Sequence, residues 1–203
     1  MDKIIQHKIA NEIIEYLKIQ NFVKNCELHG SLSGNDYDEY SDIDLRIDVS
    51  GYDNGKILLM LPYIMGKKFK LSYVAFAPKF ASDLYLVSFG LQDTSIFHFV
   101  DIECIATPHV PYLQKEEILL INNSVSLFTK LLIGCLKYEI RNKDYSKDIQ
   151  RFTKYLGIPA EDRPISLLNL CIKKLEKDAH GYVKEILNEA KTILYGKNKE
   201  NEL

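Results

Sequence analysis

Residues 42–49, which read DIDLRIDV, alternate strictly between two kinds of side chain, and this pattern most constrains how the chain can fold. Every second residue is apolar, namely Ile43, Leu45, Ile47 and Val49. Because a β-strand presents alternate side chains to opposite faces, the pattern predicts a strand with one buried face. Asp42 and Asp44 then project together from the other face. The fold must therefore hold a sheet with two neighbouring carboxylates on its polar side.

A second acidic strand is predicted at residues 95–106, SIFHFVDIECIA. Here Asp101 and Glu103 share one face, and apolar residues occupy the other. If this strand lies beside the first, a third carboxylate joins Asp42 and Asp44. Carboxylates this close repel one another unless a cation lies between them, and oxygen ligands suit Mg²⁺. Three carboxylates can hold two metal ions about 3.5–4 Å apart, a spacing that supports in-line displacement at phosphorus.

The other segments before residue 110 alternate between helical and strand-like patterns. Apolar periodicity predicts helices at 3–19 and at 54–65, with Pro62 near the end of the second. Strand composition is found in the segments CELHGS, KFKLSYVAFA and DLYLVSFGL. These elements predict a mixed β-sheet flanked by helices.

The pattern becomes helical after Pro111, and Pro108 and Pro111 together mark a domain boundary. Helices are predicted at 115–141, 145–156, 163–178 and 180–195. The expected architecture is an α+β fold in two domains, with the mixed sheet in residues 1–110 and a C-terminal α-helical bundle in residues 111–203.

The formal net charge of −2 gives no general electrostatic reason to expect tight binding to nucleic acid. The charge is unevenly spread, however. Residues 1–110 contain 10 basic and 15 acidic side chains, whereas residues 111–203 contain 16 basic and 13 acidic ones. An acidic half followed by a basic half suits a site where metal and polyphosphate meet. Solvated helix faces explain the same charges equally well.

The four cysteines, at positions 26, 104, 135 and 171, are far apart in sequence and form no zinc-binding pattern with histidine. They are expected to be buried free thiols in a reducing compartment. The longest apolar run, ILLMLPYIM, is nine residues with a proline, too short for the roughly 20 residues that a bilayer requires. The N-terminal residues show no signal-peptide pattern. We therefore expect a soluble cytoplasmic protein that does not enter the membrane.

A glycine–serine turn precedes the first acidic strand by a fixed gap. Gly30 and Ser31 are followed by ten residues and then by Asp42-Ile43-Asp44. This arrangement resembles the signature of the polymerase-β-type nucleotidyltransferase superfamily, in which an apolar residue, Gly and Gly or Ser precede Asp-apolar-Asp or Glu. His29 departs from it, because an apolar residue is usual there. The VDIEC segment is similar to the strand that carries the third carboxylate in streptomycin-type adenylyltransferases.

The resemblance implies that residues 1–110 form a nucleotidyltransferase domain. The implied reaction moves a nucleoside monophosphate from a nucleoside triphosphate to an acceptor hydroxyl and releases pyrophosphate. ATP is the implied donor, because it is the usual donor in the family. Two Mg²⁺ ions are implied, with Asp42, Asp44 and Asp101 as ligands and Glu103 as an alternative third ligand. Gly30 and Ser31 would bind the β- and γ-phosphates.

The whole chain most resembles small antibiotic nucleotidyltransferases that act on lincosamides or aminoglycosides. The implied acceptor is then a small hydroxylated molecule, and a nucleic acid is not expected because the chain lacks the extra domains of related polymerases. Modification of a protein or a tRNA end, as in toxin–antitoxin nucleotidyltransferases, is a second hypothesis. A catalytically silent nucleotide-binding protein is a third. The oligomeric state, including a homodimer, is left open.

Several roles remain open at the level of sequence. The acceptor proton goes to Asp101, Glu103 or Glu139. Lys130, Lys137 and Arg141 lie on one face of a predicted helix and could reach the triphosphate; Arg141 is the preferred candidate, and the lysines are interpreted as solvated. Arg46 could contact the phosphate or the acid cluster, or form a cross-strand ion pair. The loop tyrosines Tyr37 and Tyr40 could border the nucleotide or simply pack. The histidines His29, His98 and His109 are interpreted as packed or surface residues and not as ligands.

Overall fold

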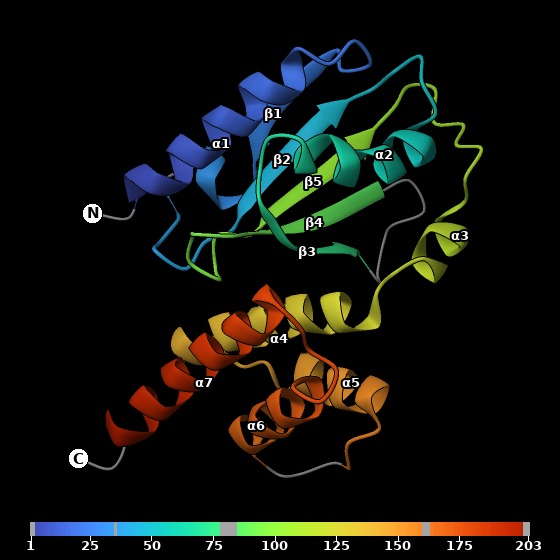
Figure 1. The fold of residues 1–203 in the computed structure, drawn as a ribbon. Coiled ribbons are helices and arrows are strands. Elements are labelled where there is room, and N and C mark those ends of the chain that lie inside the picture. The colour runs from blue at the N-terminus through green and yellow to red at the C-terminus, as the bar shows by residue number, and fades with distance from the viewer. Residues whose placement is uncertain (1–2, 35, 78–84, 160–162, 201–203) are drawn as a thin grey trace. The chain divides into compact units, whose positions relative to one another are not determined.

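The computed structural model describes residues 3–34, 36–77, 85–159 and 163–200. It contains two compact units, Met1–Asn123 and Ser124–Leu203 (Figure 1). The first unit holds all the strands of the described chain, and the second is helical. The predicted α+β class, a mixed sheet with flanking helices followed by a helical region, is confirmed.

The first unit is built on a five-stranded sheet of order β1-β2-β5-β4-β3. Its strands are β1 (Asn25–His29), β2 (Ile43–Asp48), β3 (Leu71–Phe76), β4 (Tyr85–Leu91) and β5 (Val100–Ile105). Strands β2 and β5 pair in parallel, and every other neighbouring pair is antiparallel. The two predicted acidic strands are therefore direct neighbours at the centre of the sheet.

One face of this sheet forms the core of the first unit, together with helices α1 (Lys3–Lys18) and α2 (Asn54–Gly66) (Figure 1). Ile43, Leu45 and Ile47 of β2 are at most 1% exposed, whereas the residues between them are only half-buried. The alternation predicted from sequence is thus confirmed, and the charged face of β2 is turned away from the core. Helix α2 begins at the cap residue Asp53 and continues past Pro62.

Strand β5 is shorter than predicted, because residues 95–99 form a turn. The amide of His98 donates to the carbonyl of Ser95 at 2.9 Å. Ladder pairing starts only where Val100 comes opposite Ile43, the first residue of β2. The interpretation of His98 as a strand residue is therefore wrong, because this turn keeps residues 95–98 out of the ladder.

The predicted helix 115–141 is two helices, α3 (Lys115–Leu120) and α4 (Ser124–Ile140). Between them Asn122 bonds to the backbone of the edge strand β3: its Oδ1 accepts from the Phe76 amide at 2.7 Å, and its Nδ2 donates to the Phe76 carbonyl at 3.0 Å. This pairing satisfies both backbone groups of Phe76 and interrupts the helix. Helix α3 belongs to the first unit, where Ile118 joins the core.

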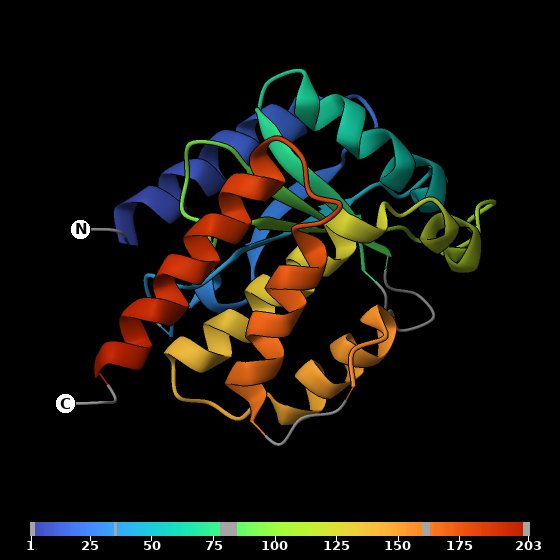
Figure 2. The same ribbon diagram turned by 60° about the horizontal axis from the view of Figure 1, so that its bottom comes forward.

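The second unit packs α4 against three further helices, α5 (Ser146–Leu156), α6 (Pro164–Leu175) and α7 (Tyr182–Glu200) (Figures 1 and 2). Their apolar stripes supply its buried side chains, among them Leu136, Phe152, Leu168 and Leu187. Gly157 closes α5 in the left-handed conformation at φ 64°, as a C-terminal glycine often does. The last three predicted helices are confirmed to within a few residues. In the described ranges no helix combines the length and apolarity needed to cross a membrane.

All four cysteines are buried free thiols, as predicted. Burial raises the pKa of the Cys26 thiol to about 11, and it raises the pKa of both Cys135 and Cys171 to about 12. Burial also raises the pKa of Cys104. A shift of two units or more lowers the reactive thiolate fraction by about 100-fold or more.

We therefore expect a thiol reagent at pH 8 to label the folded protein much more slowly than the protein in urea, with four thiols appearing only after unfolding. Counting modified cysteines by intact mass in both conditions measures this. Rapid native labelling of one cysteine would show that its burial is not maintained in solution.

Candidate metal centre

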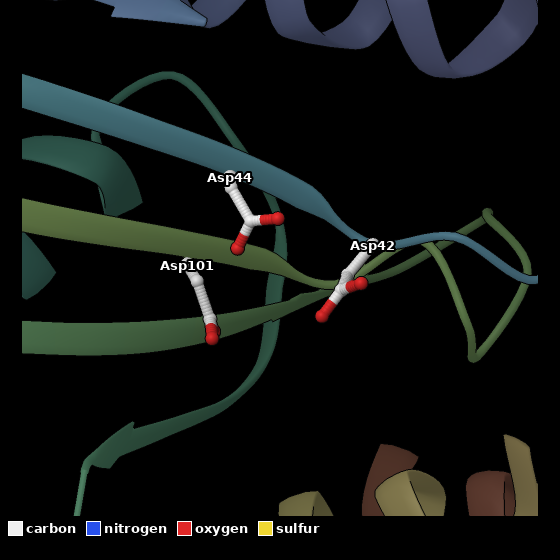
Figure 3. A group of neighbouring side chains, drawn as sticks. All are labelled: Asp42, Asp44 and Asp101. Atoms are coloured by element: carbon white, nitrogen blue, oxygen red, sulfur yellow. The ribbon is translucent and has the colours of Figure 1, made fainter. Parts of the chain in front are cut away.

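Three carboxylates converge where β2 and β5 begin. Asp44 and Asp101 are paired residues of the two parallel strands, and Asp42 precedes β2 by one residue. One carboxylate oxygen of each lies within 4.8 Å of those of the other two. Figure 3 shows the three side chains projecting to the same side of the sheet. The structure thus brings together the three residues predicted as metal ligands.

The turn before this group depends on Gly30. Its φ of 63° and ψ of −151° lie in a region that only glycine adopts without strain. A Cβ on Gly30 would overlap Oδ2 of Asp44 and would lie 2.7 Å from its Cγ. His29 is the cross-strand partner of Asp44, so the chain turns directly against that carboxylate. The glycine predicted from the motif therefore has a local reason: it leaves the space that the Asp44 side chain occupies.

Ser31 follows Gly30 as the first residue of the short 3₁₀ helix η1 (Ser31–Ser33). Oγ of Ser33 donates to the Gly30 carbonyl at 2.7 Å, and Leu32 is buried at 2% exposure. These contacts anchor the turn on the carboxylate side of β1. Gly30 and Ser31 are thus adjacent to Asp44, but their binding of phosphate stays a prediction.

The loop leading into Asp42 is held by polar contacts that the sequence did not reveal. Nε2 of Gln6 donates to the carbonyls of Asp38 and Ser41 at 3.0 and 2.7 Å. Oγ of Ser41 donates to Oδ1 of Asp38 at 3.0 Å. Gln6 is fully buried on α1, one turn before Ala10 on the core face. A glutamine in register with that apolar stripe was the signal available in the sequence.

Glu103 lies two residues beyond Asp101 on the same face and is used differently. Its Oε2 accepts from Nε of Arg46 at 2.6 Å, across the β2–β5 pair. Nη2 of Arg46 lies 3.2 Å from Nε2 of His29, and because a guanidinium only donates, the histidine nitrogen accepts. The ion pair with Glu103 confirms the ion-pair interpretation of Arg46. Among the described residues, Glu103 is not part of the carboxylate group, so its alternative role as third ligand loses its geometric basis.

The remaining predicted site residues belong to the second unit. Arg141 directly follows α4, and Lys130, Lys137 and Glu139 lie on α4. Oε2 of Glu139 accepts a hydrogen bond from the Tyr145 hydroxyl at 2.6 Å. Burial, followed by this hydrogen bond, raises the pKa of Tyr145. Roles for these α4 residues in phosphate binding or proton transfer stay predictions.

A cavity of about 600 Å³ lies in the first unit beside the loops that lead into β2 and β5. Its walls include Tyr40 and His98, which precede Asp42 and Asp101 by two and three residues. At full extension the chain between them spans at most about 11 Å. The ring of Tyr40 meets that of Phe97 edge-on at 5.3 Å, and His98 Nε2 lies 3.0 Å from the Glu39 carbonyl. The cavity is therefore lined by residues of the two loops that lead to Asp42 and Asp101.

The three-carboxylate group is chemically suited to a hard divalent cation. Two unit charges about 4 Å apart repel by about 4 kcal/mol at an effective dielectric constant of 20. A cation with oxygen ligands, such as Mg²⁺ or Mn²⁺, removes this repulsion. Asp101 is 9% exposed, so it has little water to screen its charge. The donor set thus fits a metal centre.

No family model and no curated protein matches the chain. Among solved structures, the GLD-2/RNP-8 complex is similar, with a TM-score of 0.38 and 16% identity over 87% of this chain and 56% of that one. A structure of Cid1, described for its RNA terminal uridylyl transferase activity, has a TM-score of 0.34 and 15% identity over 66% of this chain and 41% of that one. The chain spans about half the length of these solved chains.

Proposed function

We propose that the protein is a metal-dependent nucleotidyltransferase. It moves a nucleoside monophosphate from a nucleoside triphosphate to an acceptor hydroxyl. The observation that carries this proposal is the meeting of Asp42, Asp44 and Asp101 within 4.8 Å, directly against the Gly30 turn. A divalent cation and a triphosphate need such a combination of clustered carboxylates and closely approaching backbone.

Asp42, Asp44 and Asp101 would hold Mg²⁺, and two ions suit three carboxylates on neighbouring strands. When bound, the metal stabilises negative charge on the phosphoryl oxygens and orients the triphosphate. The other parts of the site are protein groups. The Gly30–Ser31 turn would bind the β- and γ-phosphates through backbone amides and the serine hydroxyl, and a phosphate-binding role for Arg141 stays a prediction.

The transfer forms one bond and breaks another. The acceptor oxygen bonds to the α-phosphorus, and the bond from that phosphorus to the α,β-bridging oxygen breaks, with its electron pair leaving on pyrophosphate. The acceptor proton goes to an Asp101 carboxylate oxygen. Asp101 is favoured over Glu103 because Asp101 belongs to the carboxylate group, whereas Glu103 lies outside it and pairs with Arg46.

The acceptor in this proposal is a small hydroxylated molecule bound in the cavity beside Tyr40 and His98, and an aminoglycoside or a lincosamide fits this description. The volume of about 600 Å³ lies in the range of small-molecule pockets. Glu39 and Asp93 also line the cavity and would favour an acceptor that carries amino groups. ATP is proposed as the donor, and the first unit, Met1–Asn123, as the catalytic domain, with Ser124–Leu203 as a helical domain.

The test is a screen for pyrophosphate release. The purified protein is incubated with Mg²⁺ and each of the four ribonucleoside triphosphates, against a panel of aminoglycosides and lincosamides and, in separate wells, pooled tRNA and pooled protein. Release that requires one acceptor, together with a mass gain of one nucleoside monophosphate on it, supports the proposal. If only tRNA or protein gains the nucleoside monophosphate, the acceptor is that macromolecule and the small-molecule acceptor is ruled out. Mg²⁺-dependent triphosphate binding without release on any acceptor would identify a silent nucleotide-binding protein.

Once an acceptor is known, kcat should fall much further in the Asp101→Asn variant than in the Glu103→Gln variant. Loss of a metal ligand removes several kcal/mol of charge stabilisation in the transition state, so Asp101→Asn should lower kcat by about 10³-fold or more. Glu103→Gln removes an ion pair outside the carboxylate group and should change kcat by less than about tenfold, since a partly exposed pair contributes little. Steady-state kinetics of both variants measure this. Equal, mild effects would mean that the third ligand lies elsewhere.

A further inference from the structure

Tyr73 lies on the same face of the sheet as the three carboxylates. Asp101 of β5 pairs with Ser88 of β4, and Gly90, two residues further on, pairs with Tyr73 of β3. Paired residues share a face, and so do residues two apart. The core-facing neighbours Val74 and Phe76 point the other way. Tyr73 is therefore separated from Asp101 by one strand only.

Gly90 lets the Tyr73 ring cross that strand. A Cβ on Gly90 would overlap Cε1 and Cδ1 of Tyr73, so the ring lies directly on the glycine backbone. A register irregularity between Leu71 and Tyr73, with Ser72 as the extra residue, accompanies this contact. Since Gly90 has no side chain, the ring extends from β3 across β4 towards the residues of β5.

The hydroxyl of Tyr73 is buried near the carboxylates. The side chain is 4% exposed, and its oxygen has no hydrogen-bond partner among the described residues. The hydroxyl of Ser88, the residue paired with Asp101, is also buried and has no hydrogen-bond partner among the described residues. Burial, followed by the negative charges of Asp101 and then Asp42, raises the pKa of Tyr73. A tyrosine hydroxyl can donate one hydrogen bond, so this group is a donor buried without an acceptor among the described residues.

We propose that Tyr73 positions Asp101 in the metal centre. In the metal-bound protein the Tyr73 hydroxyl would donate a hydrogen bond to the Asp101 carboxylate and fix its orientation beside Asp42 and Asp44. This role rests on the proposed metal-dependent function. It also explains the buried hydroxyl, because an unpaired O–H in a low-dielectric site is costly unless a partner is present in the working state.

The test measures metal binding without nucleotide or acceptor. Mn²⁺ is titrated into the purified protein, and free Mn²⁺ is followed by electron paramagnetic resonance. Removing a hydrogen bond to a metal-ligating group typically costs 10–100-fold in affinity, so Tyr73→Phe should raise the Mn²⁺ dissociation constant by about that factor. Tyr85→Phe is the matched control. Tyr85 is a buried tyrosine of the same sheet that lies in the core and donates to the Leu113 carbonyl.

A second readout reports proximity and does not depend on stability. The chain has 13 tyrosines and no tryptophan, so bound Tb³⁺ can only be sensitised through tyrosine or, weakly, phenylalanine. At saturating Tb³⁺, Tyr73→Phe should lose a measurable part of the sensitised emission, with Tyr40 near Asp42 supplying a remainder, and Tyr85→Phe should keep the wild-type emission. Gly90→Ala, which displaces the Tyr73 ring, should weaken Mn²⁺ binding like Tyr73→Phe.

The outcomes separate this inference from the proposed function. Wild-type Mn²⁺ affinity and emission in Tyr73→Phe would overturn the positioning role while leaving the metal centre in place. Equal losses in Tyr73→Phe and Tyr85→Phe would also overturn it, because they would indicate a general effect on the sheet. A wild-type protein that binds neither ion would overturn the metal centre and the proposed function with it.

Discussion

We expect Asp42→Asn and Asp44→Asn each to lower metal-dependent turnover by about 10³-fold or more, because each removes a charged ligand worth several kcal/mol in the transition state. The amide keeps the volume of the carboxyl, so the fold should persist. Removing one of three clustered negative charges also relieves repulsion within the group. The metal-free variants should therefore unfold at or above the wild-type temperature.

Thermal unfolding with and without Mg²⁺ tests this prediction independently of any acceptor. A ligand present at 100 times its dissociation constant stabilises the folded state by about 2.7 kcal/mol. The wild type should show this gain, and both variants should lose it. Asp48→Asn is the matched control, since Asp48 ends the same strand and accepts from the Ser50 amide at 2.8 Å, outside the carboxylate group. A variant at Asp42 or Asp44 with wild-type turnover and Mg²⁺ response would show that the metal is bound elsewhere.

Gly30→Ala should be nearly as damaging, although it changes no charge. A non-glycine residue at this φ and ψ costs about 1–3 kcal/mol of strain. The new methyl group would also occupy the space of the Asp44 carboxylate. Asp44 must then leave its position, so we expect weak Mn²⁺ binding and turnover reduced to about the level of Asp44→Asn, by 10³-fold.

Gly34→Ala is the control for Gly30→Ala. Gly34 lies in the same turn but has an extended backbone with φ −115°, and the nearest atom to an added Cβ is 3.8 Å away. We expect wild-type Mn²⁺ binding and turnover from this variant. Circular dichroism verifies that both variants are folded. If Gly30→Ala bound Mn²⁺ as tightly as Gly34→Ala, the contact with Asp44 would not matter for the metal centre.

The local pattern of the sequence was sufficient to predict the two strands that carry the carboxylates. A period of two places Asp42 and Asp44 on one face, whatever the rest of the chain does. The same rule placed Asp101 and Glu103 together, and helical periodicity located α1, α2 and most of the C-terminal helices. It also indicated that β2 has one buried face, which the exposures of Ile43, Leu45 and Ile47 confirm.

Where the sequence reading failed, contacts between distant residues had decided the outcome. Ladder pairing of β5 starts only at the Val100–Ile43 pair with β2, and the helix predicted across residues 115–141 stops because Asn122 bonds to Phe76. Neither contact produces a periodic pattern in the sequence. Periodicity reports which way a side chain faces but not which strand lies next to it.

The sequence by itself thus determined that this protein has two acidic strand faces and a glycine–serine turn, because side-chain direction in a strand is a local property. Only the tertiary structure decided that Asp44 and Asp101 stand opposite each other, that Glu103 goes to Arg46, and that Tyr73 reaches across Gly90. These outcomes depend on strand order and register, which arise from pairing between segments far apart in the chain.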